Sequence, residues 1–138
     1  AATLTATTAL TAPSLSVDSV AVLDTSSANG TSFSGSAVDL ATYAFATYRT
    51  VKFVGHIVDD STHETDAFEI LVTYDGASGP GATSDIHMTT YAYISSNDTP
   101  MGTFAAVKSG SNVALQFTNT VMNFTGSYAV TTTQLIKT

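Results

Sequence analysis

The chain has 138 residues, no cysteine and a formal net charge of −7, with four lysine and arginine residues in total. The lack of cysteine excludes disulfides and thiolate chemistry. Four cations are too few to neutralise the phosphates of nucleic acid or to hold an anionic membrane surface. We therefore expect no binding to nucleic acid. No apolar stretch approaches the roughly 18 residues of a membrane-spanning helix, so we also expect no membrane insertion.

Residues 1–12 read AATLTATTALTA, which is low in complexity and shows neither a helical stripe nor a helix cap. We expect this segment to be an extended N-terminal arm that becomes ordered when it lies on a neighbouring subunit. Pro13 ends the arm, and residues 13–138 are expected to form one folded domain. A domain of this length can bury a core without the help of a metal or a disulfide.

Two strands separated by a loop are expected in the next part of the chain. Residues 16–25 are rich in valine and read as a strand, and residues 37–47 read as a second strand. Between them, residues 26–36 are rich in serine and glycine, and the pair Asn29 and Gly30 readily adopts positive φ. The sequence therefore predicts a loop at 26–36.

Residues 46–76 read as two strands joined by an acidic loop, and the rest of the domain is arranged around them. One face of each strand is apolar at a spacing of two, which is typical of half-buried antiparallel strands. The inward positions are Val51, Phe53, Gly55 and Ile57 in the first strand and Phe68, Ile70, Val72 and Tyr74 in the second. Asp75 and Gly76 then indicate a turn.

After a Gly- and Pro-rich loop at 77–83, the chain continues as short strands with turns between them. The strand expected at 85–94 places two alternating sets on its faces: Ile86, Met88, Ala92 and Ile94 on one, and Asp85, His87, Tyr91 and Tyr93 on the other. Further strands are expected at 101–108, at 113–117 and at 128–136. About seven to nine short strands without a helical pattern predict an all-β fold, either a β-sandwich or a small barrel. Of these we expect a single antiparallel β-sandwich of jelly-roll-like type.

The loop between the central strands concentrates acidic side chains, whose oxygen atoms suit Ca²⁺ or Mg²⁺. The candidate metal ligands are Asp59, Asp60, Glu64 and Asp66, to which His63 adds a nitrogen atom for a transition metal. The spacing is not that of an EF-hand, because the glycine and the terminal glutamate of that motif are missing. A solvated hairpin loop accounts for the same residues, so we expect no metal and no other cofactor.

Three histidines, His56, His63 and His87, would permit a Ser-His-Asp triad, and the carboxylates raise the question of glycoside hydrolysis. No Gly-x-Ser-x-Gly sequence marks a nucleophile. The chain also lacks tryptophan, and few of its acids lie in expected strands, which disfavours a sugar-cleaving cleft. We therefore expect no catalytic residues and no enzymatic activity.

Four tyrosines and one arginine are the candidate interface residues. Tyr43, Tyr91, Tyr93 and Tyr128 are expected to be exposed, where they would stack on sugar rings or anchor a subunit interface, in which tyrosine is enriched. Because both faces of several strands carry apolar residues, interface burial is the favoured use. Arg49 is a lone cation near the acidic loop and is expected to form a structural or interface ion pair with a carboxylate.

Four segments follow one another in the order and spacing of a known family pattern: ATYRTVKF at 46–53, EILVTYDG at 69–76, GTFAA at 102–106 and GSNVALQFT at 110–118. With them, residues from about 36 to 138 resemble a β domain common in virion proteins of tailed bacteriophages, particularly the T4-like phages of marine cyanobacteria. The loops at 59–66 and 77–82 depart from the pattern, and residues 1–35 fall outside it.

The resemblance implies a component of a phage particle and brings no catalytic residues with it. We expect a non-enzymatic structural subunit of the virion, in the tail, a fibre, the neck or a capsid decoration. It would assemble with copies of itself, as a trimer or a higher symmetric oligomer, and with other virion proteins. The alternative is a host-surface adhesion module that binds carbohydrate through its tyrosines or through a cation on the acidic loop.

Overall fold

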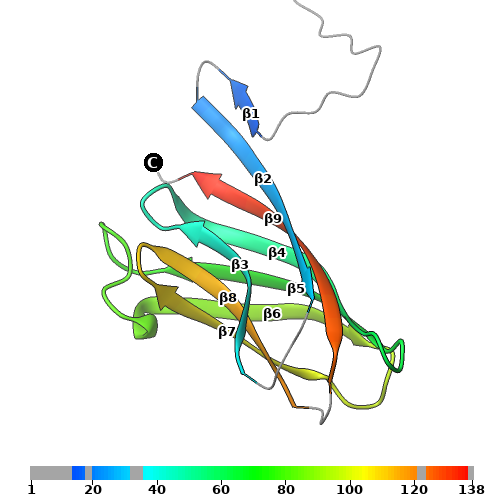
Figure 1. The fold of residues 1–138 in the computed structure, drawn as a ribbon. Coiled ribbons are helices and arrows are strands. Elements are labelled where there is room, and N and C mark those ends of the chain that lie inside the picture. Colours follow the sequence, from blue (N-terminus) through cyan, green and yellow to red (C-terminus); the bar gives the residue numbers. More distant parts are fainter. Residues whose placement is uncertain (1–13, 18–19, 32–35, 121–123, 137–138) are drawn as a thin grey trace, which may run out of the picture.

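The computed structural model describes residues 14–17, 20–31, 36–120 and 124–136, and the predicted arm at 1–12 lies outside them. The described residues form two antiparallel β-sheets that pack face to face (Figure 1). The all-β sandwich predicted from the sequence is confirmed. No helix in this part of the chain is long and apolar enough to cross a membrane.

The larger sheet has six strands in the order β1-β2-β9-β4-β5-β6, and the smaller sheet has three in the order β3-β8-β7. The strands are β1 (Ser14–Val17), β2 (Val20–Thr31), β3 (Val38–Ala44), β4 (Tyr48–Asp59), β5 (Thr65–Tyr74), β6 (Ile86–Ser95), β7 (Gly102–Ser109), β8 (Asn112–Asn119) and β9 (Gly126–Ile136). A single 3₁₀ turn, Thr83–Asp85, precedes β6. The division into six and three strands is more uneven than in a jelly roll, which has eight strands in two Greek keys.

The core lies between the two sheets. The alternation predicted for the central pair is confirmed, since the inward side chains of β4 and β5 are buried: Val51, Phe53, Ile57, Phe68, Ile70, Val72 and Tyr74. The small sheet adds Leu40, Tyr43, Val113, Leu115 and Phe117. The Phe104 ring of β7 bridges the sheets, with its centroid 4.6 Å from that of Phe68 and 5.3 Å from that of Phe117. Burial of each such side chain contributes roughly 1.5–3 kcal/mol.

Strand β2 is longer than the sequence predicts. The loop expected at 26–36 is wrong for its first six residues, because β2 continues to Thr31. Asn29 and Gly30, which favour a turn, are paired with Ala129 and Tyr128 of β9. The long neighbouring strand provides backbone hydrogen-bond partners along this whole stretch, and tertiary pairing overrides the local turn preference.

Strand β6 contains an irregularity that reverses the predicted direction of its last side chains. Ile70 is opposite Thr90, whereas Glu69 is opposite Ala92, so Tyr91 is an extra residue in β6. One inserted residue exchanges the two faces of every position after it. As a result Tyr93 packs against the core, and Ile94, which the alternation places on the same face as Ile86 and Met88, is 71% exposed.

Candidate interaction surface

The side of the large sheet that faces away from the small sheet carries the most exposed apolar side chains. We call this side the outer face, and it is formed by β4, β5, β6 and β9. Among the described residues, the exposed large hydrophobic side chains are Val54, Leu71, Tyr91, Ile94 and Leu135. Val54, Leu71 and Leu135 alternate with buried residues of their own strands, as Val54 does with Phe53 and Leu71 with Ile70. Tyr91 lies beside the outward Lys52, and Ile94 is opposite Ala67, which alternates with the buried Asp66 and Phe68. All five therefore belong to the outer face.

One ion pair lies in the middle of this apolar surface. The Nζ atom of Lys52 is 2.8 Å from a carboxylate oxygen of Glu69 and 5.4 Å from the ring centroid of Tyr91. The hydrogen bond to Glu69 raises the pKa of Lys52 to about 12, and the same bond lowers the pKa of Glu69. Both groups stay charged around neutral pH, and their charges cancel.

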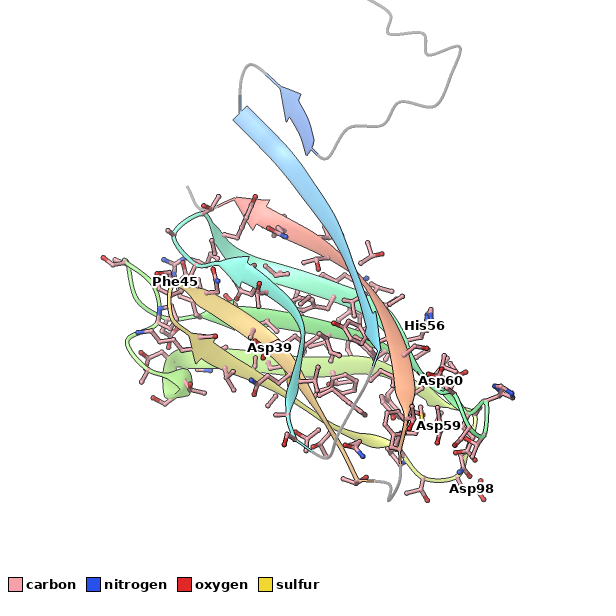
Figure 2. The ribbon with its side chains drawn as sticks, viewed as in Figure 1. Asp39, Phe45, His56, Asp59, Asp60 and Asp98 are labelled. Atoms are coloured by element: carbon pink, nitrogen blue, oxygen red, sulfur yellow. The ribbon has the colours of Figure 1, made fainter. Side chains whose placement is uncertain are left out.

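The other carboxylates of these four strands do not reach the outer face. Asp59 of β4 and Asp66 of β5 are buried, at 3% and 0% exposure. The outer face is thus close to neutral, although the whole chain has a formal charge of −7. His56 is exposed on the outer side of β4 (Figure 2).

A shallow hollow of about 180 Å³ lies on the outer face, between Val54 and Ile94. It exists because Ala67 and Ala92 place only small side chains on the outer face there. A Cβ atom added to Gly55 would lie 2.9 Å from the ring of Phe68 and 2.5 Å from the carbonyl oxygen of Ala129. Gly55 therefore faces the core, where no side chain fits, and its backbone lines the hollow together with Phe68.

The four predicted interface tyrosines lie in different surroundings. Tyr91 is exposed on the outer face, as predicted. The prediction that Tyr43 is exposed is wrong: its side chain is 3% exposed in the core, where burial raises the pKa of its hydroxyl. Tyr93 and Tyr128 are half-buried and pack against the core. In the sequence, both tyrosines stand at alternate positions that are typical of exposed residues. The local sequence shows neither the bulge in β6 nor the packing of β3 over Tyr128.

Arg49 lies at the end of the sandwich where the Gly- and Pro-rich loop returns. Its guanidinium donates hydrogen bonds to the carbonyl oxygens of Tyr74 and Gly76, at 3.3 and 3.1 Å, and lies over the Tyr74 ring at 5.0 Å. The predicted ion pair with a carboxylate is not formed within the described part of the chain. Arg49 instead fixes the turn after β5, in which Gly76 has a φ of 98°.

The four candidate metal ligands are each engaged by protein groups. Asp59 accepts hydrogen bonds from the backbone and hydroxyl groups of Ser61 at 2.8 and 2.6 Å, and Asp66 accepts them from the Met101 backbone at 2.8 Å and from the Tyr93 hydroxyl. The partner of Asp60 is Ser127, and the partner of Glu64 is Asn97. In the described ranges, no three His, Asp or Glu side chains are grouped to hold a metal.

The acidic end of the sandwich is therefore a set of structural contacts. Asp59, Asp60 and Asp98 lie at this end, opposite to Phe45 (Figure 2). The expectation of a wholly solvated loop at 59–66 is wrong at its two ends, where Asp59 and Asp66 are buried. The hydrogen bond of Ser61 is the main cause that lowers the pKa of Asp59.

The three histidines are not brought together. His56 lies opposite Ala67, which pairs with Ile94, whereas His87 lies at the other end of β6. The Nε2 atom of His87 is 3.0 Å from a carboxylate oxygen of Asp75, and both side chains are well exposed. His63 lies in the loop between β4 and β5, with a φ of 63°.

The apolar residues of the outer face are not predicted as a group from the sequence. The signal was present, because Val54 and Leu71 stand at positions that the alternation assigns to the exposed side. The sequence alternation puts Ile94 on the same face as Ile86 and Met88, so its place on the outer face follows only from the bulge in β6.

Comparisons with known proteins give a likeness in fold. No protein-family model and no curated protein sequence matches the chain. The structure is similar to parts of two tailspike proteins. The one from Acinetobacter phage vB_ApiP_P1 has a TM-score of 0.50 and 15% identity over 99% of this chain. The one from Acinetobacter baumannii phage AM24 has a TM-score of 0.43 and 10% identity over 85%. The chain spans about a quarter of the length of each, 25% and 27%.

Proposed function

We propose that the chain is a non-enzymatic structural component of a bacteriophage virion, which assembles through the outer face of its large sheet. The observation that carries the proposal is the set of exposed apolar side chains on β4, β5, β6 and β9. Clustered apolar surface of this kind is typical of sites where proteins meet. In a solvated sandwich, by contrast, the outward positions of a strand are polar.

The composition of the outer face suits a protein interface. Its centre holds the aromatic ring of Tyr91 and one ion pair, and apolar side chains surround them. Aromatic residues are enriched and unpaired charges are depleted at the cores of interfaces. Because Lys52 and Glu69 are already paired, covering them does not leave an uncompensated charge.

The place in the virion is inferred from two independent likenesses. The sequence of residues 36–138 resembles a β domain of tailed-phage particles, and the fold resembles part of a phage tailspike. Together they favour the tail among the tail, fibre, neck and capsid positions. The partners would be copies of the chain and other virion proteins.

A second function, adhesion to host carbohydrate, is favoured by one specific arrangement. The exposed Tyr91 ring is bordered by a lysine and a glutamate, and a hollow lies beside Glu69 and Ala92. An aromatic face with polar groups at its rim is suited to a sugar ring, which has an apolar side and a border of hydroxyls.

The test compares two lysine substitutions in phage that encodes the chain. Ile94→Lys places a charge on the outer face, and Ala105→Lys places the same charge on an exposed position of β7, in the other sheet. We expect purified particles to contain the wild-type chain and the Ala105→Lys chain in similar amounts, and to contain markedly less of the Ile94→Lys chain. Particles that lack the wild-type chain would contradict the proposal. Normal incorporation of Tyr91→Ala with weaker adsorption to the host would favour adhesion.

A further inference from the structure

The first two strands form a hairpin whose far end has no neighbour in the rest of the described chain. Strand β1 is hydrogen-bonded to β2 alone. Residues 20–23 of β2 pair with β1, and the pairing of β2 with β9 begins only at Asp24. Figure 1 shows β1 and this end of β2 extending beyond the two packed sheets. We call residues 14–17 and 20–23 the projecting hairpin.

A hairpin of this kind requires a cover to be stable. Two strands alone are marginally stable in water, and a further layer or further strands are needed to hold them. In addition, β1 is an edge strand, which offers free backbone groups to another chain. The two segments of the hairpin, SLSV at 14–17 and VAVL at 20–23, contain no charged residue. Its composition suits contact with an apolar and uncharged surface.

The same chain carries such a surface, but the hairpin does not reach it within one molecule. Strand β2 is a member of the large sheet, so the hairpin continues in the plane of that sheet. It would have to abandon the pairing of β2 with β9 to fold back over its own outer face. A hairpin that packs on an outer face therefore does so on the outer face of another molecule.

Charge also favours a second copy as the occupant. Two copies of a chain with a charge of −7 repel each other except where local charges cancel. On the outer face the charges of Lys52 and Glu69 cancel. A basic partner would be drawn instead to the acidic end, where Asp59, Asp60 and Asp98 lie.

We propose that the projecting hairpin of one copy lies on the outer face of the next copy, over the hollow between Val54 and Ile94. The inference rests on the proposed role of the outer face in assembly and names its partner. The contact is heterologous, since two different surfaces meet, and such contacts close into rings when the rotation between copies permits. Each copy then has its hairpin and its outer face covered.

The absence of cysteine allows a clean cross-linking test in the full chain. Ser16→Cys marks the hairpin and Ile94→Cys marks the outer face; the two variants are mixed and treated with a short bis-maleimide. We expect cross-links between positions 16 and 94. The matched control is Ala105→Cys on the opposite sheet, which should give no product with Ser16→Cys. Unchanged melting temperatures would show that the variants fold.

Two results would overturn the inference. Cross-links of position 94 with itself alone would show that outer faces meet each other. A monomer without cross-links would show that copies do not associate. If Ile94→Lys is nevertheless lost from particles, another virion protein covers the outer face, and the proposed function stands without the hairpin contact.

Discussion

At the scale of single residues, the acidic side chains act mainly through hydrogen bonds that hold neighbouring segments of the fold together. Asp59 ends β4 and accepts hydrogen bonds from the next turn, and Asp66 joins β5 to Met101 and Tyr93. Both residues were candidate metal ligands because the sequence shows the chemistry and spacing of the side chains. It does not show which protein groups lie close enough to hydrogen-bond to them. A carboxylate that already accepts several hydrogen bonds gains less from a cation.

The role of Asp59 predicts a pH-dependent stability. Its pKa is lowered from 3.8 in the folded chain, so its contribution is present above about pH 3.8 and is lost as the pH falls through the folded pKa. We expect Asp59→Asn to lower the free energy of unfolding by about 1–2 kcal/mol at neutral pH. Urea unfolding should show that this difference shrinks below about pH 3.8.

The matched control for Asp59 is Asp98→Asn, an exposed carboxylate at the same end of the sandwich. This variant should change stability little at either pH. An Asp59→Asn variant with the same deficit at both pH values would contradict the assignment of its stabilising role to the charged carboxylate.

At the scale of elements, β4 shows the two uses of one strand. Phe53 is fully buried between the sheets, whereas its neighbour Val54 is 40% exposed on the outer face. We expect Phe53→Ala to cost about 3–5 kcal/mol through lost burial and a cavity. Val54→Ala should cost less than about 1 kcal/mol. Denaturant unfolding at low protein concentration, where association is weak, measures both.

Equal losses for these two variants would contradict this assignment of faces. A large loss for Val54→Ala that appears at high protein concentration alone would instead report on assembly, because a mutation in an interface destabilises the oligomer and not the isolated fold.

The strands also show which features of the fold can be predicted from the sequence. The period of two predicts β4, β5, β8 and their buried rows, because burial on one face selects apolar side chains locally. The extra residue at Tyr91 and the extension of β2 to Thr31 were not predictable in this way. Both depend on the partner strand: β5 fixes the register of β6, and β9 supplies the hydrogen bonds of β2.

The candidate site could be predicted in part for the same reason. Tyr91 was named correctly as exposed, and a role in assembly was expected from apolar residues on both faces. The expected exposure of Tyr43 is wrong, because Tyr43 lies opposite Val113 and faces the core, in a strand whose register is irregular between Asp39 and Ala41. An irregular register changes which alternate residues of a strand point inward, and the local sequence does not indicate where such an irregularity occurs.

At the scale of the whole molecule, the uneven sheets explain where contact surfaces arise. Three strands cover one side of a sheet of six. The outer face of the large sheet and the hairpin at its end are left without a protein layer within the described chain. The charges are unevenly distributed over these surfaces. Acidic side chains lie at the end of the sandwich that holds Asp59, Asp60 and Asp98, and the outer face is close to neutral.

The central claim is that the outer face is an assembly surface, and the most direct measurement is the molar mass of the purified chain by light scattering. We predict a defined trimer or larger oligomer over a range of concentrations, unchanged by a chelator, with Ala105→Lys the same and Ile94→Lys shifted to monomer. A wild-type chain that is monomeric at every concentration, or an Ile94→Lys oligomer of unchanged mass, would contradict self-assembly through this face.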